Sequence, residues 1–474
     1  MHDLSRLVSS NPTLSAIEDL FSPETYLVGG CIRDMLRGQE PLDFDIVTFS
    51  DVGSFADKIA RRFSSTAFWM DKTRGVVRIS LKGKGITIDV CLPKGHDIVA
   101  DLRKRDITIN AMAYAVSACE LIDPLDGLVD LGHGVIRIIS EDSLRDDPAR
   151  VVRCLRFSVV LGFPIAASTA ALLKKYACKV ATVSAERIKQ EFMKALCDQN
   201  GSRFFTLMET TGVIKALFPD IIYQGKDISL KGLRSALFLA RETDGLIYDA
   251  EILLPGSDRD LAQEVESKLS RAGLLRLAAF VFGIAPYRNT EELDKSAVLQ
   301  AVNPEQGILI AREICSSLKV SSRAITLINS MYASQKLVHE ILSQKDLPVR
   351  IVHLLCEKAF SCLPETLLLA WALKRSPHSG NKAFLKHVHL KEKIQEIWRY
   401  FVDIYQVQKQ NQLIDGNDVI RSLGIAPGPM VGRLLLEVEA ARAEGVVNSR
   451  QEAIDHLHVL ARQIQICPDM KRST

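Results

Sequence analysis

Short strand-like runs occur only near the beginning of this 474-residue chain, and their confinement there constrains its fold more than any other feature. Four runs rich in β-branched and aromatic residues are separated by glycine-containing turns, as strands of a mixed α/β unit are. They are residues 25–28, 44–48, 76–81 and 86–91. From about residue 140 onward, apolar residues recur at helical spacing and prolines interrupt the pattern. The sequence therefore predicts an α+β protein, with a small α/β head on a mixed sheet followed by an elongated all-α neck, body and tail.

These patterns predict four parts: a head over 1–136, a neck over 137–200, a helical body over 201–390 and a helical tail over 391–474. Hydrophobic residues make up 47% and charged residues 25% of the chain, which is ordinary globular composition and excludes wholesale disorder. None of the ten cysteines forms a CxxC pair, so we interpret them as reduced. The start lacks a signal-peptide pattern, and the apolar runs fall short of the ~18–20 residues that span a bilayer. We expect a cytoplasmic protein with no membrane partner.

Two glycines and two aspartates form the first candidate site. Gly29 and Gly30 follow an apolar strand and open a helix-like segment, where glycine lets the backbone approach a phosphate closely. Asp43 and Asp45 flank Phe44, and because residues two apart share a face of a strand, the two carboxylates emerge together. Adjacent anions repel unless a cation neutralises them, and hard oxygen ligands suit Mg²⁺. The pattern predicts a pair that holds metal at a nucleotide's phosphates, with a polar edge strand as the alternative.

A third carboxylate lies on another predicted strand. Asp89 occurs in the run 86–91, where it could accept the proton of an incoming 3′-hydroxyl. A solvent-facing aspartate on a strand explains the same pattern, so both interpretations stay open.

Basic residues are concentrated in the head although the net charge of the whole chain is only +3. Between residues 58 and 105, twelve Lys and Arg side chains stand against four Asp, a local net charge of +8. Such a region attracts a triphosphate or an RNA backbone, although charged turns on a solvated face explain part of the excess.

Five motifs in order carry a resemblance to a known family. Gly29-Gly30-x-x-Arg33-Asp34 with Asp43-x-Asp45 resembles the first motif of the class II template-independent nucleotidyltransferases, which include tRNA CCA-adding enzymes and bacterial poly(A) polymerases. The other four motifs follow in the family's order, at 105–111, 123–131, 146–157 and 186–191. The sequence departs from the family at Ile107, where Phe is usual, and at Asp146, where Glu is usual.

The resemblance implies a catalytic nucleotidyltransferase head, a nucleotide-recognition neck and a tRNA-binding tail. Asp43 and Asp45 would hold two Mg²⁺ ions and form the catalytic set with Asp89. The implied nucleotide-binding residues are Gly29, Gly30, Arg33, Arg105, Asp106, Asn110, Asp147, Arg150, Arg153 and Arg156. Among them the glycines and Arg33 would cradle phosphates, Arg105 and Asp106 would read the ribose, and Asp147 and Arg150 would read the base.

The residues alone leave other interpretations for several of these positions. Arg105 and Asp106 could form an ion pair at a strand end, and Asn110 could cap a helix. Pro148 fits the first position of a helix and Asp147 the cap before it. The arginines at 150, 153 and 156 recur every three residues, so they could equally form the solvated basic face of that helix.

The resemblance implies an enzyme that adds or repairs all or part of the CCA end of tRNA with CTP and ATP, releasing pyrophosphate. Residues 413–432 are similar to the tail motif of tRNA nucleotidyltransferases, whereas a poly(A) polymerase is the alternative. Only 15 residues separate Asp89 from Arg105, where typical CCA-adding relatives have a longer, flexible loop that helps them switch from cytosine to adenine. Addition of CCA, CC or A alone therefore stays open.

A non-catalytic RNA-binding protein on the same scaffold is a further alternative. Loss of Asp43 or Asp45 would be its signature, and both residues are present. We expect no protein partner.

Overall fold

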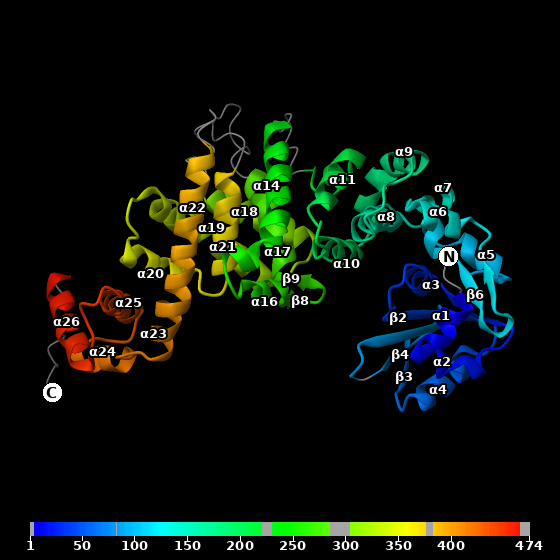
Figure 1. Cartoon of the computed structure of the whole chain (residues 1–474), viewed down its shortest axis with the longest axis horizontal. Helices are drawn as coiled ribbons and strands as arrows, with labels where there is room; N and C mark the ends of the chain where they lie inside the picture. The colour runs from blue at the N-terminus through cyan, green and yellow to red at the C-terminus, as the bar shows by residue number, and fades with distance from the viewer. Residues whose placement is uncertain (1–3, 82, 220–229, 285–303, 376–382, 465–474) are drawn as a thin grey trace. The chain divides into compact units, whose positions relative to one another are not determined.

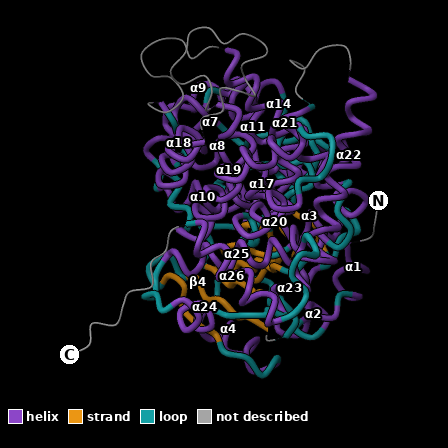
Figure 2. Tube along the Cα trace, turned by 90° about the vertical axis from the view of Figure 1, so that its left-hand side faces the viewer, coloured by secondary structure: helices purple, strands orange, loops and turns teal. Residues whose placement is uncertain are grey.

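The computed structural model describes residues 4–81, 83–219, 230–284, 304–375 and 383–464. The chain forms two compact units, which we call the sheet unit (1–195 with 207–217) and the helical unit (196–206 with 218–474) (Figure 1). The strands of the large sheet gather in one patch, drawn in orange in Figure 2. This arrangement confirms the α+β prediction, whereas the finer division into head, neck, body and tail stays a prediction. None of the helices in the described ranges combines the length and apolarity that a membrane span needs.

The sheet unit is built around a mixed seven-stranded sheet with the order β3-β4-β5-β2-β1-β6-β7. Strands β2 and β5 are parallel, and the other neighbouring strands are antiparallel. The strands are β1 (Thr25–Val28), β2 (Asp43–Thr48), β3 (Ala67–Asp71), β4 (Val76–Leu81), β5 (Ile86–Cys91), β6 (Ala113–Ala115) and β7 (Glu120–Ile122). The sequence predicts β1, β4 and β5 with these bounds and β2 to within one residue. It does not reveal β6 and β7, which have three residues each, or the edge strand β3, whose central residues are all exposed.

Alternation along β2 separates its side chains between the two faces of the sheet. Phe44 and Ile46 are buried in the main core of the unit, together with apolar residues of the first four helices. Val47 belongs to a smaller core on the other face, which includes Ile98 and Leu102. Full burial of each such side chain contributes about 1.5–3 kcal/mol, so the register of β2 is firmly set. The odd-numbered Asp43 and Asp45 are consequently held on the face of Val47.

Helices of the sheet unit begin where short polar side chains cap them. Asn11, Asp51, Asp97 and Ser140 each accept backbone N–H groups at the start of a helix. The helices are α1 (Leu4–Ser10), α2 (Pro12–Ser15), α3 (Gly30–Leu36), α4 (Val52–Arg62), α5 (Ile98–Arg103), α6 (Gly127–His133), α7 (Glu141–Asp146), α8 (Ala149–Val160), α9 (Ala167–Tyr176), α10 (Ala185–Leu196) and α12 (Val213–Leu217). The residues of α11 (Arg203–Thr211) are divided between the two units.

The helical unit consists of helices and one short strand pair, β8 (Glu264–Glu266) with β9 (Leu269–Ser270). A π-helical segment, Tyr400–Tyr405, joins α22 to α23. The helices are α14 (Leu230–Tyr248), α15 (Ala250–Leu253), α16 (Ser257–Ala262), α17 (Arg271–Ile284), α18 (Pro304–Ser317), α19 (Ser322–Ser343), α20 (Val349–Lys358), α21 (Leu363–Lys374), α22 (Ala383–Arg399), α23 (Gln406–Gln410), α24 (Gly416–Leu423), α25 (Pro429–Ala443) and α26 (Arg450–Gln463).

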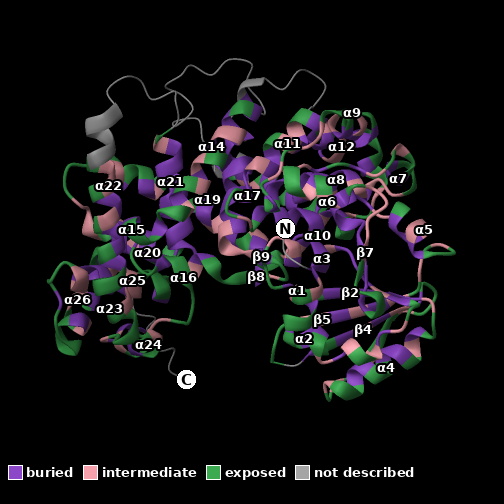
Figure 3. Cartoon of the chain, turned by 45° about the vertical axis from the view of Figure 1, so that its right-hand side comes forward, coloured by how far each residue is buried: buried purple, intermediate pink, exposed green. Residues whose placement is uncertain are grey.

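Buried residues run along α17 and α21, the most apolar helices of this unit (Figure 3). Arg276, in the middle of α17, is also buried, and it is fully paired. Its guanidinium donates to Asp244 at 2.5 Å, to the Leu196 carbonyl at 2.8 Å and to the Gln199 carbonyl at 3.0 Å. These bonds satisfy a charge that would otherwise be costly to bury.

The last three helices share a core of their own, which includes Val419, Leu434 and Leu457.

Candidate active site

The predicted aspartate pair lies beside the glycine turn at the end of β1. Asp45 is the register partner of Val28 in the antiparallel β1–β2 pair, and Gly29 follows directly. Asp43 is exposed and Asp45 is half-buried, while Phe44 between them is buried. Burial raises the pKa of the Asp45 carboxyl, and the negative charges of Asp89 and Asp43 raise it further. This repulsion is the electrostatic condition that a bound cation relieves.

Asp89 lies next to Asp45 because β2 and β5 pair in parallel with these two residues in register. Its carboxylate also accepts a bidentate pair from Arg78 of β4, at 2.7 and 2.6 Å. Asp89 therefore lies on the same face of the sheet as Asp43 and Asp45. To accept a proton, its carboxylate would have to weaken its ion pair with Arg78.

Gly29 brings backbone and charged groups into close approach. Its φ of +80° suits glycine, and a Cβ there would lie 2.9 Å from an Arg105 guanidinium nitrogen and 3.4 Å from the Asp45 carboxylate. Arg105 is fixed by Asp101, whose carboxylate accepts from two of its nitrogens at 3.1 and 3.0 Å. The glycine turn, Asp45 and Arg105 thus lie close together.

Arg33, expected to cradle phosphates, is engaged by neighbouring groups. It donates two hydrogen bonds to Asp34, at 2.9 and 2.8 Å, and one to the Asn110 side chain at 2.5 Å. Its guanidinium also lies over the Phe157 ring, 5.4 Å from the centroid. Asn110 ends the short 3₁₀ helix Thr108–Asn110 and bonds to Asp106, so the alternative that it caps a helix is wrong.

A buried ion-pair network connects the ribose motif to the following helices. Asp106 accepts two hydrogen bonds from Arg153, at 2.9 and 2.7 Å, and Arg153 donates a third to Glu191 at 3.1 Å. Glu191 also accepts from Arg156 at 2.5 Å. Although burial opposes ionisation, the Arg153 guanidinium lowers the pKa of Asp106 to about 2. The alternative in which Arg105 and Asp106 pair with each other is wrong, because each has a different partner.

The two residues expected to read the base lie at the start of α8. Asp147 pairs with Arg187 at 2.7 Å and accepts the Ala149 N–H at 3.2 Å. The cap position of α8 belongs to Pro148, one residue later than predicted. Arg150 donates to the carbonyls of Lys104 at 2.6 Å and Arg105 at 2.8 Å, and to the Ser143 hydroxyl at 2.7 Å.

These groups surround a strongly polar cavity of about 320 Å³ in the sheet unit. Six cationic and two anionic side chains line it, so an anionic ligand would be favoured. They are Arg74, Lys94, Arg105, Arg150, Arg153, Arg187, Asp106 and Asp147. Of the predicted residues, Arg105, Asp106, Asp147, Arg150 and Arg153 line this cavity. The residues outside its lining are Gly29, Gly30, Arg33, Asp43, Asp45, Asp89, Asn110 and Arg156.

Four residues that were not among the predicted site residues also contribute to the site. They are Arg74, Lys94, Arg187 and Glu191. Arg187 and Glu191 belong to the motif at 186–191, for which the resemblance implies no residue roles. Lys94 lies in a Pro-Lys-Gly turn and Arg74 in a Thr-Arg-Gly turn, and their convergence depends on the sheet register.

Metal binding is compatible with Asp43 and Asp45 together with a ligand. Among the described residues, no group of three or more His, Cys, Asp or Glu side chains could hold a metal ion. Mg²⁺ usually takes one or two carboxylates and completes its coordination with waters and substrate phosphates. Asp43, which is exposed, and Asp45, whose carboxylate is repelled by the charges of Asp43 and Asp89, fit that donor set.

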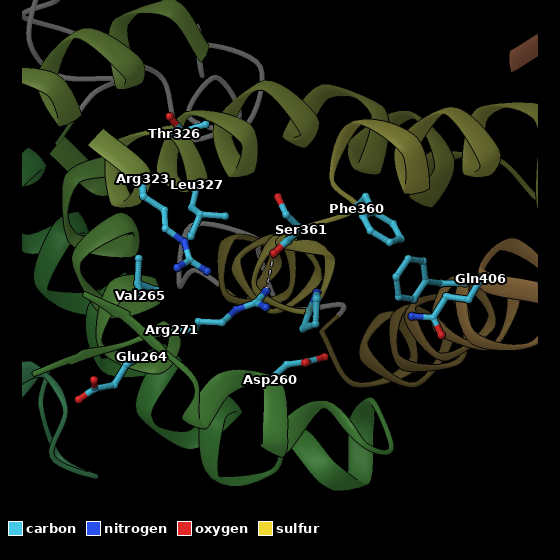
Figure 4. Close-up of a pocket in the computed structure, with 12 residues that line it drawn as sticks. Asp260, Glu264, Val265, Arg271, Arg323, Thr326, Leu327, Phe360, Ser361 and Gln406 are labelled. Carbon is cyan, nitrogen blue, oxygen red and sulfur yellow. Dashed lines mark hydrogen bonds between the residues drawn. The ribbon is translucent and has the colours of Figure 1, made fainter. Parts of the chain in front are cut away.

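A second cavity, of about 540 Å³, lies within the helical unit (Figure 4). Arg271 on its wall is held by a bidentate pair with the buried Glu365, at 2.5 and 2.8 Å, and by the Ser361 carbonyl at 2.7 Å. Phe360 and Phe401 also line the cavity. The residues that line this cavity include no pair of carboxylates beside a glycine turn.

Two family models match the chain. The poly A polymerase head domain matches residues 25–137, and the probable RNA and SrmB-binding site of polymerase A matches residues 162–224.

Curated relatives match over most of the chain. A CC-adding tRNA nucleotidyltransferase of Geobacter sulfurreducens is 30% identical over 91% of each chain. Another from Synechocystis is 27% identical over 94% of this chain and 95% of its own. An A-adding tRNA nucleotidyltransferase of Deinococcus radiodurans is 26% identical over 91% and 94%.

Solved structures share the fold. A CCA-adding enzyme in complex with CTP has a TM-score of 0.68 and 24% identity, covering 98% of this chain and 99% of the other. The Thermotoga maritima CCA-adding enzyme complexed with tRNA has a TM-score of 0.64 and 23% identity, covering 97% and 98%.

Proposed function

The chain belongs to the class II template-independent nucleotidyltransferases, the family of the tRNA nucleotidyltransferases, and we propose that it adds the two cytidines of the CCA end to tRNA. In the reaction, the 3′-hydroxyl of the RNA attacks the α-phosphorus of CTP. A phosphodiester bond forms, and pyrophosphate leaves with the electrons of the broken P–O bond. Two cycles would extend a tRNA that ends before CCA to one that ends in CC.

The observation that carries the choice of CC is the short connection between Asp89 and Arg105. It leaves β5 at Cys91 and enters α5 at Ile98, with Asp97 capping the helix. CCA-adding relatives typically have a longer, flexible loop here, which helps them change from cytosine to adenine. The two CC-adding relatives are 30% and 27% identical to this chain and the A-adding relative is 26% identical, which supports addition of CC over addition of the single terminal A.

The residues divide the task by their chemistry. Asp43 and Asp45 would hold Mg²⁺, which would supply positive charge to the nucleotide's phosphates and lower the pKa of an attacking hydroxyl. Arg105 and Asp106 would face the ribose, since one can donate and the other accept hydrogen bonds. The cytosine edge offers one amino donor and two acceptors, which Asp147 and Arg150 can satisfy without a template. Arg150 would exchange its backbone carbonyl partners for the base.

The pair of carboxylates also supports nucleotidyl transfer over RNA binding alone. A binding protein needs no such pair, whose repulsion is costly in the absence of a cation. Because tRNA and CTP are the proposed substrates, we also propose a cytoplasmic location.

The test offers the purified protein three tRNAs, ending before CCA, after C and after CC, with CTP and ATP supplied separately. We expect CTP to extend the first by two residues and the second by one, and ATP to extend none. Extension of only the third, by ATP, would replace CC addition with A addition. Complete CCA synthesis would refute the argument from the short connection, and long adenylate tails on unstructured RNA would indicate a poly(A) polymerase.

Variants separate catalysis from binding. Asp43→Asn should bind tRNA normally and incorporate no radiolabelled cytidine, because it removes one predicted metal ligand. Asp142→Asn is the matched control, since Asp142 is exposed and lies outside the cavity. Substantial incorporation by Asp43→Asn would contradict the metal assignment.

A further inference from the structure

The short connection after β5 is firmly fixed to α5. The Lys94 N–H donates to the buried carboxylate of Asp101 at 2.8 Å, and the Lys104 ammonium donates to the Lys94 carbonyl. Gly95 packs so closely that a Cβ would lie 2.5 Å from the Ala100 Cβ and 3.0 Å from the Ala100 carbonyl carbon. The backbone on both sides of the Lys94 side chain is therefore held in place.

A second turn is fastened to the first. The β3–β4 turn contains Arg74 and Gly75, and the Leu92 N–H donates to the Gly75 carbonyl at 3.1 Å. Gly75 has a φ of +62°, and a Cβ there would lie 2.5 Å from a Leu92 methyl carbon. The two turns thus form one local structure that places Arg74 and Lys94 on the wall of the 320 Å³ cavity.

The Lys94 ammonium lies among other cations. Burial, with the positive charges of Arg105 and Arg150, lowers its pKa. Within the described part of the chain, no carboxylate forms an ion pair with it, because Asp101 contacts only its backbone and pairs with Arg105. Arg74 has one weak partner, Asp71 at 3.7 Å. By contrast, Arg153 and Arg187 on the same wall are paired with carboxylates.

We propose that Lys94 binds the triphosphate of the incoming nucleotide, with Arg74 as an auxiliary contact. This inference rests on the proposed function and adds a nucleotide-binding residue to it. A cavity of about 320 Å³ is too small to enclose a length of RNA, so we infer that Lys94 faces a single nucleotide there. A compact ammonium suits a phosphate oxygen and offers no acceptor to a base's amino group.

The proposal distinguishes two ways in which Lys94 could matter. A residue that only supports the cavity would affect every ligand equally. A residue that binds phosphate should affect ligands in proportion to their phosphates, and arginine should replace it because its charge is retained.

The experiment compares Lys94→Met and Lys94→Arg with wild type and with Lys84→Met, which removes the same charge from an exposed turn outside the cavity. Calorimetry measures the affinity for CTP, cytidine and inorganic triphosphate, and steady-state assays measure KM for CTP and for tRNA. We expect Lys94→Met to lower the affinity for CTP and for inorganic triphosphate about tenfold, and to leave the affinity for cytidine and the KM for tRNA unchanged. Lys94→Arg should stay within about threefold of wild type, as should Lys84→Met.

Equal weakening of cytidine and CTP would overturn the proposal, as would an effect confined to KM for tRNA, which would place an RNA phosphate at Lys94. Unchanged affinity for CTP and triphosphate in Lys94→Met would also overturn it. Binding of inorganic triphosphate needs no transfer to tRNA, so failure of this proposal is distinguishable from failure of CC addition.

Discussion

Replacing the buried Asp106 by Asn should destabilise the region around α8 in a way that depends on pH. The pKa of Asp106 is about 2, against its ordinary value of 3.8, because Arg153 outweighs the effect of burial. One pKa unit corresponds to 1.36 kcal/mol, so the ionised carboxylate contributes about 2 kcal/mol at neutral pH. That contribution should be absent from the Asp106→Asn protein.

The sign of the pH dependence follows from the lowered pKa. The contribution of Asp106 is complete above the unfolded pKa and disappears as the pH falls through the folded one. With these two values, about half of it should remain at pH 3. The difference between wild type and variant should therefore shrink by about 1 kcal/mol between pH 7 and pH 3.

Hydrogen exchange of peptides from α8 measures this difference locally. Intrinsic exchange rates cancel in the ratio of variant to wild type, so the ratio reports the local free energy of opening. We expect the ratio to fall roughly sixfold between pH 7 and pH 3. The exposed Asp142→Asn serves as control and should change protection by less than about 1 kcal/mol. A ratio for Asp106→Asn that is the same at both pH values would refute the paired, ionised state of Asp106.

Three further outcomes are expected. Gly29→Ala should lower kcat/KM by about tenfold or more, because the new Cβ would lie 2.9 Å from a guanidinium nitrogen. Gly38→Ala is the control, since Gly38 has a φ of +72° but open space around it, and this variant should keep its kcat/KM. Equal kcat/KM values for the two variants would contradict the prediction. Glu365→Gln should destabilise the helical unit by about 3–5 kcal/mol, since it leaves the largely buried Arg271 without its counter-ion, and exchange along α21 measures this. Burial lowers the pKa of His353 to about 4, so stability should fall by up to about 3 kcal/mol from pH 7 to pH 4, and His353→Gln should abolish that loss in acid unfolding experiments.

The parts of the site that the sequence predicts are those that depend on local pattern. Asp43 and Asp45 share a strand face because they are two residues apart, and Gly29 follows the strand that pairs with them. Neither inference needs knowledge of a distant contact. The same holds for β1, β4 and β5, whose runs of β-branched and other apolar residues are bounded by turns.

The ion pairs could not be predicted in this way, because their partners are far apart in the chain. Asp106 and Arg153 are 47 residues apart, and Arg153 and Glu191 are 38 apart. A local interpretation pairs Arg105 with its neighbour Asp106, whereas the fold directs the first to Asp101 and the second to Arg153. Charge complementarity is apparent from the sequence, but the choice of partner depends on tertiary structure.

The distribution of these pairs explains how a chain with a net charge of only +3 can present a cationic site. Arg153 and Arg156 of α8 are neutralised by the carboxylates of Asp106 and Glu191, so these two arginines contribute little free charge. On the two turns, Lys94 forms no ion pair with a carboxylate of the described residues, and Arg74 has only its weak pair with Asp71. An entering polyanion therefore gains most from the turns, while the helix supplies rigid geometry. The short connection after β5 thus has a second consequence in this chain, because its fixed backbone holds Lys94 where we propose that the triphosphate binds.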